Sequence, residues 1–185
     1  MKMQIVFRPW AAIVSVVALT GLISGCVPAM EGEETTRVPP AQRVDPPATP
    51  ITAPSIDAEQ TLSTEDYAGQ VVLLDFWAPW SEQSVEELAQ MADLQREFGE
   101  HGFTVVGMVI ERGEPDEIRA KLEGREFAYP VMIASAEMLR PYGSRAIPTR
   151  VLLDASGEVA GTFPGSVSFD ELRQEIKQLL DGLQP

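Results

Sequence analysis

Two serines, Ser81 and Ser84, follow an apolar run at the start of a predicted helix, a place where a nucleophile could act. A serine hydroxyl becomes a nucleophile only when a base lies within about 3 Å of it. The single histidine of the chain, His101, lies just past the far end of that helix, roughly 25–30 Å away. Asp75 or a glutamate would have to act as the base instead, so a serine hydrolase has little support.

The charge balance of the chain also limits its partners. The 185 residues include 14 basic and 28 acidic side chains, for a formal net charge of -14. Such a surface repels the phosphates of nucleic acids and anionic lipid headgroups, so we predict no nucleic-acid partner. With one histidine and no cluster of thiolates, we also predict no metal site, and we predict no cofactor.

The first 25 residues have the layout of a secretion signal, with two basic residues before an apolar run. The run, residues 10–23, would span only ~21 Å as a helix, short of the ~30 Å hydrocarbon core of a bilayer. It closes on "LISGC", which ends at Cys26, the only cysteine of the chain. This ending resembles the lipobox of bacterial lipoproteins, although a plain signal peptide or an uncleaved anchor is the alternative.

The lipobox resemblance implies that Cys26 carries lipid, of the palmitate type, and becomes the first mature residue. The protein would then be anchored in the membrane of a bacterial cell envelope and face the periplasm. Val27, in place of an aspartate, favours the outer membrane by the same resemblance. One cysteine cannot form an internal disulfide, and an acylated Cys26 would leave no free thiol in the mature chain.

Residues 26–54 predict a disordered tether between this anchor and the folded part. Seven of residues 27–54 are proline, and large apolar residues are few. Such a segment cannot bury enough surface to offset its ordering entropy. We therefore predict a signal peptide over residues 1–25, the tether over 26–54 and one folded domain over 55–185.

Strands and helices alternate along residues 55–185. Residues 71–77 and 103–110 are continuous apolar runs typical of buried strands, and residues 85–98 carry a helical apolar stripe. A strand–turn–strand pattern around "ASG" precedes a terminal helix that Ser168 can cap. The remaining predicted elements are helices at 115–122 and 136–142 and a strand at 129–134. This order indicates an α/β fold whose parallel sheet gains an antiparallel edge from the hairpin.

Four stretches resemble the thioredoxin fold, and specifically the TlpA/ResA-like branch of membrane-tethered thiol-disulfide oxidoreductases. They are "TLSTEDYAGQVVLLDFWAPW", "SEQS", "GEPDEIRAKLEGREFAYPV" and "YGSRAIPTRVLLDASGEVAG". The resemblance spans most of residues 55–183 and implies a central mixed sheet with helices on both faces. In that family a CxxC motif stands where this chain has Ser81 to Ser84.

The two serines exclude dithiol chemistry, because thiol-disulfide exchange needs a thiolate that attacks a disulfide sulfur. A hydroxyl ionises far less readily than a thiol and forms no disulfide. The serines instead suit a helix start: either can cap it, and Ser84 with Glu87 has the spacing of a capping box. Glu82, Glu86 and Glu87 would place negative charge in the first turn, which stabilises a helix but disfavours a thiolate.

Asp75 interrupts an otherwise apolar strand and matches the buried acid of many thioredoxins, which assists proton transfer to a thiol. Here it has no thiol to serve, and we interpret it as a hydrogen-bonded acid retained in the core. A buried carboxyl without a cation has a raised pKa, so we predict that Asp75→Asn raises stability at neutral pH.

The resemblance also implies a groove that offers backbone groups to an extended polypeptide. Its residues here would be Trp77, Trp80, Ala146, Ile147, Pro148 and Thr149, with Pro148 in the cis form. For Trp77 we favour packing in the core, whereas Trp80 is as well suited to a binding surface as to the core.

Two functional hypotheses follow from these residues. The first is a redox-inactive pseudoenzyme, a thioredoxin-fold lipoprotein that binds or scaffolds a polypeptide partner in the cell envelope. The second is an enzyme of the thiol-disulfide oxidoreductase family with residual or non-standard redox activity. It requires that Cys26 stay unacylated and act alone, or that the serines replace native cysteines.

Overall fold

The computed structural model describes residues 50–57 and 60–183 of the chain. The predicted signal segment, Cys26, Val27 and most of the predicted tether lie outside the described residues. The boundary at residue 54 is wrong, because strand β1 spans Thr52–Pro54 and the side chains of Ile51 and Ala53 are buried. The proline residues of this stretch led to the prediction of a tether, whereas β1 is a short strand that pairs with β2 (Thr61–Ser63).

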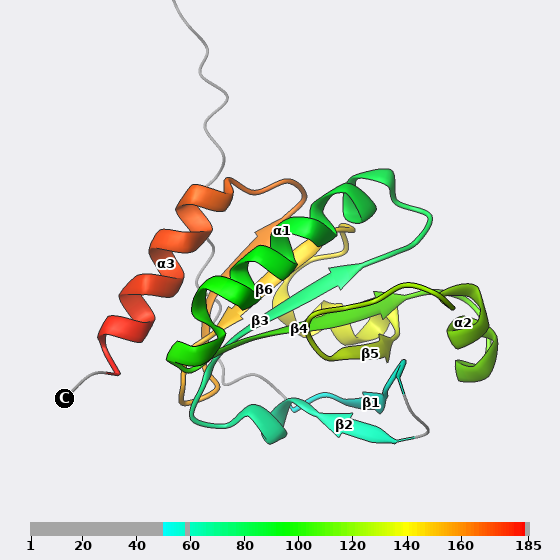
Figure 1. Ribbon diagram of the computed structural model, residues 1–185, viewed down its shortest axis with the longest axis horizontal. Helices are drawn as coiled ribbons and strands as arrows, with labels where there is room; N and C mark the ends of the chain where they lie inside the picture. Colours follow the sequence, from blue (N-terminus) through cyan, green and yellow to red (C-terminus); the bar gives the residue numbers. More distant parts are fainter. Residues whose placement is uncertain (1–49, 58–59, 184–185) are drawn as a thin grey trace, which may run out of the picture. The chain divides into compact units, whose positions relative to one another are not determined.

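A five-stranded mixed sheet forms the centre of the domain (Figure 1), in the order β5-β4-β3-β6-β7. Strands β3, β4 and β5 are parallel, whereas β6 is antiparallel to both β3 and β7. The strands are β3 (Val71–Trp77), β4 (Phe103–Ile110), β5 (Val131–Ala134), β6 (Thr149–Leu153) and β7 (Val159–Pro164). The predicted thioredoxin fold with a mixed sheet is therefore confirmed.

Three α-helices cover one face of this sheet, the face that Figure 1 views. They are α1 (Glu82–Phe98), α2 (Pro115–Lys121) and α3 (Phe169–Asp181). Alternate strand residues such as Leu73 and Val105 point toward these helices and meet their apolar stripes. Each stripe is buried because one helix face is apolar and the opposite face is charged.

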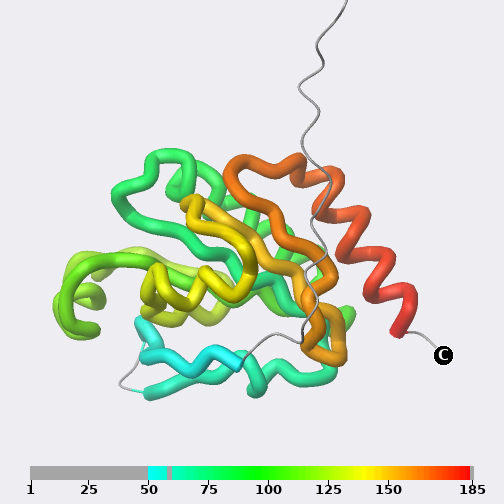
Figure 2. The backbone as a smooth tube through the Cα atoms, turned by 180° about the vertical axis from the view of Figure 1, so that it is seen from behind, coloured from blue at the N-terminus to red at the C-terminus, as the bar shows by residue number. Residues whose placement is uncertain are grey.

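The opposite face is covered by shorter elements, as Figure 2 shows from behind. They are the 3₁₀-helix η3 (Ala136–Tyr142), the β1–β2 hairpin and, next to β2, the 3₁₀-helix η1 (Thr64–Tyr67). The sequence predicted a helix over residues 136–142, and the 3₁₀ form accommodates Pro141 inside it. Helices therefore lie on both faces, but among the described residues only one face carries α-helices.

Local signals explain where the remaining elements start and turn. The Ser168 hydroxyl accepts a hydrogen bond from the Glu171 backbone N–H and caps α3, as predicted. Pro115 occupies the first turn of α2. Gly157 has a φ of 83° in the turn between β6 and β7, a left-handed conformation that glycine adopts without strain.

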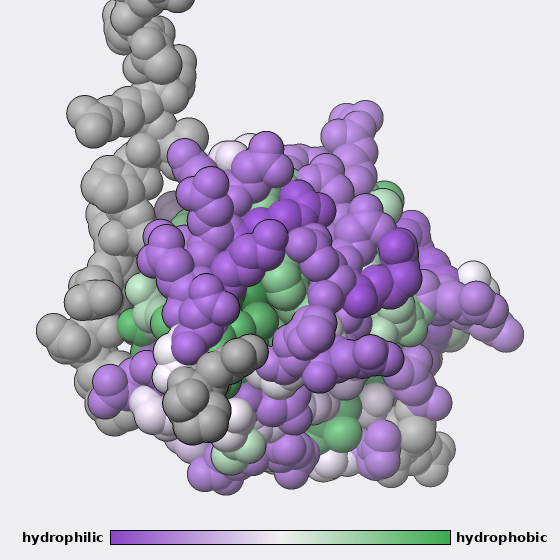
Figure 3. Space-filling model, turned by 60° about the vertical axis from the view of Figure 1, so that its left-hand side comes forward, coloured by the Kyte–Doolittle hydropathy of each residue, from purple (hydrophilic) through white to green (hydrophobic). Residues whose placement is uncertain are grey.

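The surface seen in Figure 3 is mostly hydrophilic, with apolar residues showing between the hydrophilic ones. This agrees with the excess of acidic side chains in the chain. No helix within the described part of the chain combines the length and apolar character needed to cross a bilayer.

Candidate functional site

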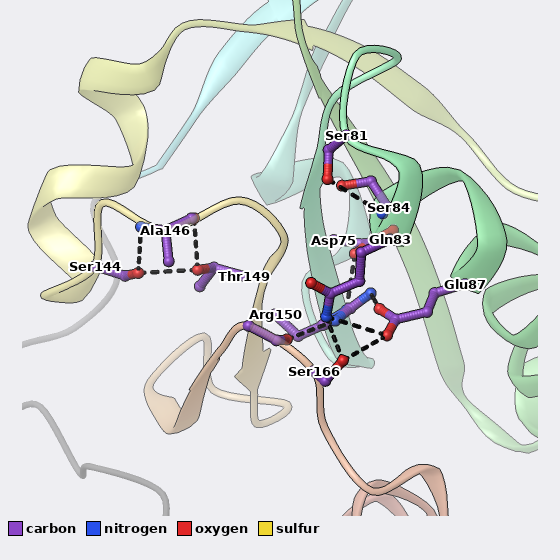
Figure 4. Close-up of polar contacts among 11 residues, drawn as sticks. Asp75, Ser81, Gln83, Ser84, Glu87, Ser144, Ala146, Thr149, Arg150 and Ser166 are labelled. Atoms are coloured by element: carbon purple, nitrogen blue, oxygen red, sulfur yellow. Dashed lines mark hydrogen bonds and ion pairs between the residues drawn. The ribbon is translucent and has the colours of Figure 1, made fainter.

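The predicted site begins in the turn between β3 and α1. Ser81 is the N-cap residue of α1, and its Oγ accepts a hydrogen bond from the Ser84 backbone N–H at 3.3 Å (Figure 4). The backbone of Ser81 is extended, as a cap requires, and the helix begins at Glu82. The prediction that one of the two serines caps the helix is confirmed, and Ser81 is that residue.

Ser84 lies inside the first turn of α1 and is buried. Its Oγ has no hydrogen-bond partner among the described residues. The predicted capping box of Ser84 with Glu87 is wrong, because Ser84 follows the cap instead of forming it. Of the three glutamates predicted for the first turn, only Glu82 lies there.

The loop before β6 contains a cis peptide bond between Ile147 and Pro148, as predicted. Side-chain hydrogen bonds close this loop on itself (Figure 4). The buried hydroxyls of Ser144 and Thr149 are 2.9 Å apart, the Thr149 hydroxyl donates to the Ala146 carbonyl at 2.8 Å, and the Ala146 N–H donates to Ser144 Oγ at 3.1 Å. The loop shape is thus held from inside, while Ala146 remains exposed.

The two tryptophans near the turn differ sharply in exposure. Trp77 is fully buried, packs against Phe127 at a ring-centroid distance of 5.7 Å, and belongs to the core, as favoured above. Trp80 is 65% exposed, which is unusual for so large an apolar side chain.

Because Phe76 pairs with Thr149 across the sheet, the end of β3 and the start of β6 lie side by side. The other predicted groove residues divide between the surface and the core: Ile147 is partly buried, and Pro148 and Thr149 are buried.

A buried charge cluster lies beneath this turn, on the sheet face that α1 and α3 cover. Asp75 on β3 and Arg150 on β6 are cross-strand partners, and each side chain is 1% exposed. Arg150 Nε donates to Asp75 Oδ1 at 3.0 Å, and Arg150 Nη2 donates to the Glu87 carboxylate of α1. Two acids from different elements therefore share one guanidinium. We name these three side chains the buried charge cluster.

The buried position of Asp75 is as predicted, but the expectation that it lacks a cation is wrong, because Arg150 supplies one. Burial nevertheless raises the pKa of Asp75 to about 6, and the negative charge of Glu87 raises it too, whereas the Arg150 charge and hydrogen bond lower it. The pKa of Asp75 is therefore raised, as the sequence predicted, but Arg150 makes the increase smaller than it would be for an unpaired acid.

Arg150 and Glu87 are the site residues that sequence reasoning missed. The signal was present: a single arginine in "PTRVLLD" and a single aspartate in "VVLLDFW" each interrupt a predicted buried strand. A charged side chain that points into the core from one strand is stable only when an opposite charge on a neighbouring strand pairs with it. The register that pairs Asp75 with Arg150 was not available from the sequence.

His101 is exposed and lies at the end of the 3₁₀-helix that follows α1, as expected. Within residues 50–57 and 60–183, no group of three or more His, Cys, Asp or Glu side chains could hold a metal ion.

A mixed sheet covered by helices, a helix that begins directly after the central strand and a cis-proline loop beside it define a thioredoxin-fold protein. The chain belongs to the AhpC/TSA family, whose model matches residues 44–162.

Relatives of known name agree with this assignment. The thiol-disulfide oxidoreductase ResA of Geobacillus thermodenitrificans is 28% identical over an alignment of 127 residues that covers 65% of this chain and 67% of ResA. The thioredoxin-like protein YneN of Bacillus subtilis is 28% identical over 116 residues, 62% of this chain and 68% of YneN. The chain is thus similar to a thiol-disulfide oxidoreductase over about two thirds of its length.

Solved structures show the same fold. A Chlorobium tepidum protein described as a putative thiol:disulfide interchange protein DsbE superposes with a TM-score of 0.66 at 24% identity. The superposition covers 76% of this chain and 99% of the Chlorobium chain. The exposed lipoprotein thioredoxin Etrx1 of Streptococcus pneumoniae superposes with a TM-score of 0.63 at 27% identity, covering 71% of this chain and all of its own.

Proposed function

We propose that this protein is a redox-inactive thioredoxin-fold module that binds a polypeptide partner in the cell envelope and is held there by lipid on Cys26. One observation carries the proposal. Ser81 and Ser84 occupy the start of α1, where the resembled oxidoreductases have CxxC, and the Ser81 hydroxyl serves as a helix cap.

The chemistry of the cluster supports the loss of redox function. The only cysteine of the chain is Cys26, which lies outside the described residues. The acid that could assist a thiol, Asp75, is instead hydrogen-bonded to Arg150. The described residues at the start of α1 include no sulfur, so they supply no group for thiol-disulfide exchange.

Binding is assigned to the surface around Trp80, at the same end of the sheet as the loop of Ala146 and Ile147. An exposed tryptophan supplies a large, rigid contact area and is enriched among residues that dominate interface energies. The backbone of the exposed loop suits an extended polypeptide by strand addition. The acidic domain disfavours a nucleic-acid partner.

The envelope location is supported by the lipobox at Cys26 and by the similarity to a pneumococcal protein described as an exposed lipoprotein. A lipid on Cys26 is the membrane contact, and Val27 favours the outer membrane. We expect Cys26→Ser to move the protein from the membrane fraction to the soluble fraction, and mass spectrometry of the mature N-terminus to show an acylated cysteine. An unmodified Cys26 would remove the anchor from the proposal.

The redox part is tested by an insulin-reduction assay of the full-length protein, which retains Cys26. We expect no activity above the blank for the natural sequence. A Ser81→Cys, Ser84→Cys double variant is the matched control, because it restores two thiols at the same helix start and shows whether the assay detects them in this fold. Activity of the natural sequence above the blank would overturn the proposal and favour the oxidoreductase alternative.

The binding part is tested by pull-down from envelope extract. Trp80→Ala removes the exposed ring, and Leu183→Ala removes the other large exposed apolar side chain of the described residues, 45% exposed and at the end of the domain. We expect Trp80→Ala to lose the partner and Leu183→Ala to retain it. Equal recovery by both variants would discard the surface around Trp80.

A further inference from the structure

Arg150 makes contacts with four separate segments around one guanidinium. It bonds to Asp75 on β3 and to Glu87 on α1, and its Nη1 donates to the Gly165 carbonyl at 2.9 Å, in the loop between β7 and α3. Its guanidinium carbon also lies 5.9 Å from the centre of the Phe169 ring, at the start of α3. A side chain 1% exposed with these contacts is fixed in position.

The loop that Arg150 holds is attached to the cis-proline loop. The Gly165 N–H donates to the Pro148 carbonyl at 2.8 Å, so the peptide groups around Gly165 join Arg150 to Pro148. The neighbouring Ser166 hydroxyl donates to Glu87 at 3.2 Å and also bonds to Gln83 (Figure 4). The first turns of α1 and the cis-proline loop are thus connected through Arg150 and residues 165–166.

The charges in this connection do not balance. With both acids ionised, the buried charge cluster carries two negative charges and one positive charge. Tyr129, in the segment that leads into β5, also interacts with Asp75: the burial of the Tyr129 hydroxyl raises its own pKa, and the Asp75 charge raises it further. Glu87 is the member nearer to solvent, with 12% of its side chain exposed. A buried uncompensated charge is costly, and release of Glu87 to solvent would relieve it.

We propose that Arg150 is the positioning residue of the cis-proline loop, and that the protonation state of Asp75 sets how firmly Arg150 connects that loop to α1. A neutral Asp75 leaves one ion pair, Arg150 with Glu87, and a closed connection. Each acid has its own N–H donor on Arg150, but an ionised Asp75 adds a second buried negative charge that one guanidinium does not balance, and Glu87 then separates together with its bond to Ser166. Because burial raises the pKa of Asp75 to about 6, the change falls near neutral pH.

This connection concerns the fold of the domain alone and needs no partner. Only its consequence, a binding surface that is more ordered in acid than at neutral pH, rests on the proposed function. The test therefore uses the isolated protein, and a failure of the pull-down above would leave its outcome unaffected.

The test is amide hydrogen exchange of the folded protein by NMR between pH 5 and pH 8, expressed as protection factors corrected for intrinsic exchange. We expect protection of the Gly165 N–H to fall by about tenfold as the pH rises through 6, since one unit of pKa shift couples to a tenfold change in the opening equilibrium. The Val106 amide in β4 is the internal control for global unfolding. Equal changes at Gly165 and Val106, or no change at Gly165, would overturn the proposal.

Two variants sharpen the result. Asp75→Asn mimics the neutral acid, and we expect Gly165 protection in it to be independent of pH. Glu87→Gln removes the competing charge, so we expect the Asp75 carboxyl to titrate at lower pH while Gly165 protection decreases at every pH. The ¹³C titration of Asp75 in the natural sequence needs no variant, and a midpoint at the ordinary value near 4 would by itself refute the proposal.

Discussion

Arg150 decides the character of the site at the scale of single residues. The Arg150 guanidinium bonds to three charged or polar groups in the core, and without it the two acids Asp75 and Glu87 would be buried without a cation. Such a cluster contributes little net stability, because desolvation offsets much of the attraction. Removing only one member of the cluster strongly destabilises the fold, since the remaining charges stay buried without a partner.

We therefore expect Arg150→Met to lower the free energy of unfolding by about 3–5 kcal/mol at pH 7. Urea denaturation measures the change. Arg145→Met is the matched control, because Arg145 is exposed and lies in the loop that leads into β6. A loss for Arg150→Met no larger than for Arg145→Met would contradict the role of Arg150 in the cluster.

Asp75 links the stability of the domain to pH. Its folded-state pKa, about 6, is above its ordinary value of 3.8, so its favourable contribution is complete below about pH 4 and is lost as the pH rises through 6. The shift corresponds to about 3 kcal/mol. We expect the stability difference between Asp75→Asn and the natural sequence to become more favourable to the variant by a large part of that amount between pH 4 and pH 7. Parallel pH profiles of the two proteins would be inconsistent with a raised pKa.

At the scale of the element, helix α1 shows how two serines of one motif take different roles. The Ser81 hydroxyl satisfies a backbone N–H of the first turn, whereas the Ser84 hydroxyl is buried without a partner among the described residues. The same residue type is therefore stabilising at one position and costly at the other.

We expect Ser81→Ala to destabilise the domain by about 1 kcal/mol through loss of the cap. Ser84→Ala removes an unpaired hydroxyl from the core, and we expect it to be neutral or stabilising. Ser81→Asp is a further control, because aspartate also caps and suits the helix dipole. Thermal or urea unfolding of the three variants gives the order, and a larger loss for Ser84→Ala than for Ser81→Ala would reverse this assignment.

The order of the main strands and helices was predictable from the sequence because each has a strong periodic or apolar pattern. Strands β3 and β4 read as continuous apolar runs, and α3 has a cap and a stripe. The β1–β2 hairpin was missed because its two strands have three residues each and contain too few positions to show alternation. Short strands are recognised only from what they pack against.

At the scale of the whole molecule, the hairpin changes where the domain begins. Ile51 and Ala53 belong to the core on the η3 side of the sheet, so the domain starts before residue 55.

A chain that starts at residue 55 should therefore be less stable than one that starts at residue 50. We expect a loss of about 2–4 kcal/mol, from the buried Ile51 side chain and the β1 pairing. Urea unfolding of the two chains measures it. Equal midpoints would show that the hairpin is not part of the cooperative unit.

The sequence by itself determined the absence of a CxxC motif, the lipobox resemblance at Cys26 and the thioredoxin order of elements, because these depend on residue identity and local periodicity. Only the tertiary structure decided that Ser81, and not Ser84, is the cap, that Trp80 is exposed while Trp77 is buried, and that Asp75 meets Arg150 and Glu87. The physical reason is register and packing: residues 75 positions apart become neighbours only when β3 and β6 pair, and no local pattern specifies that alignment.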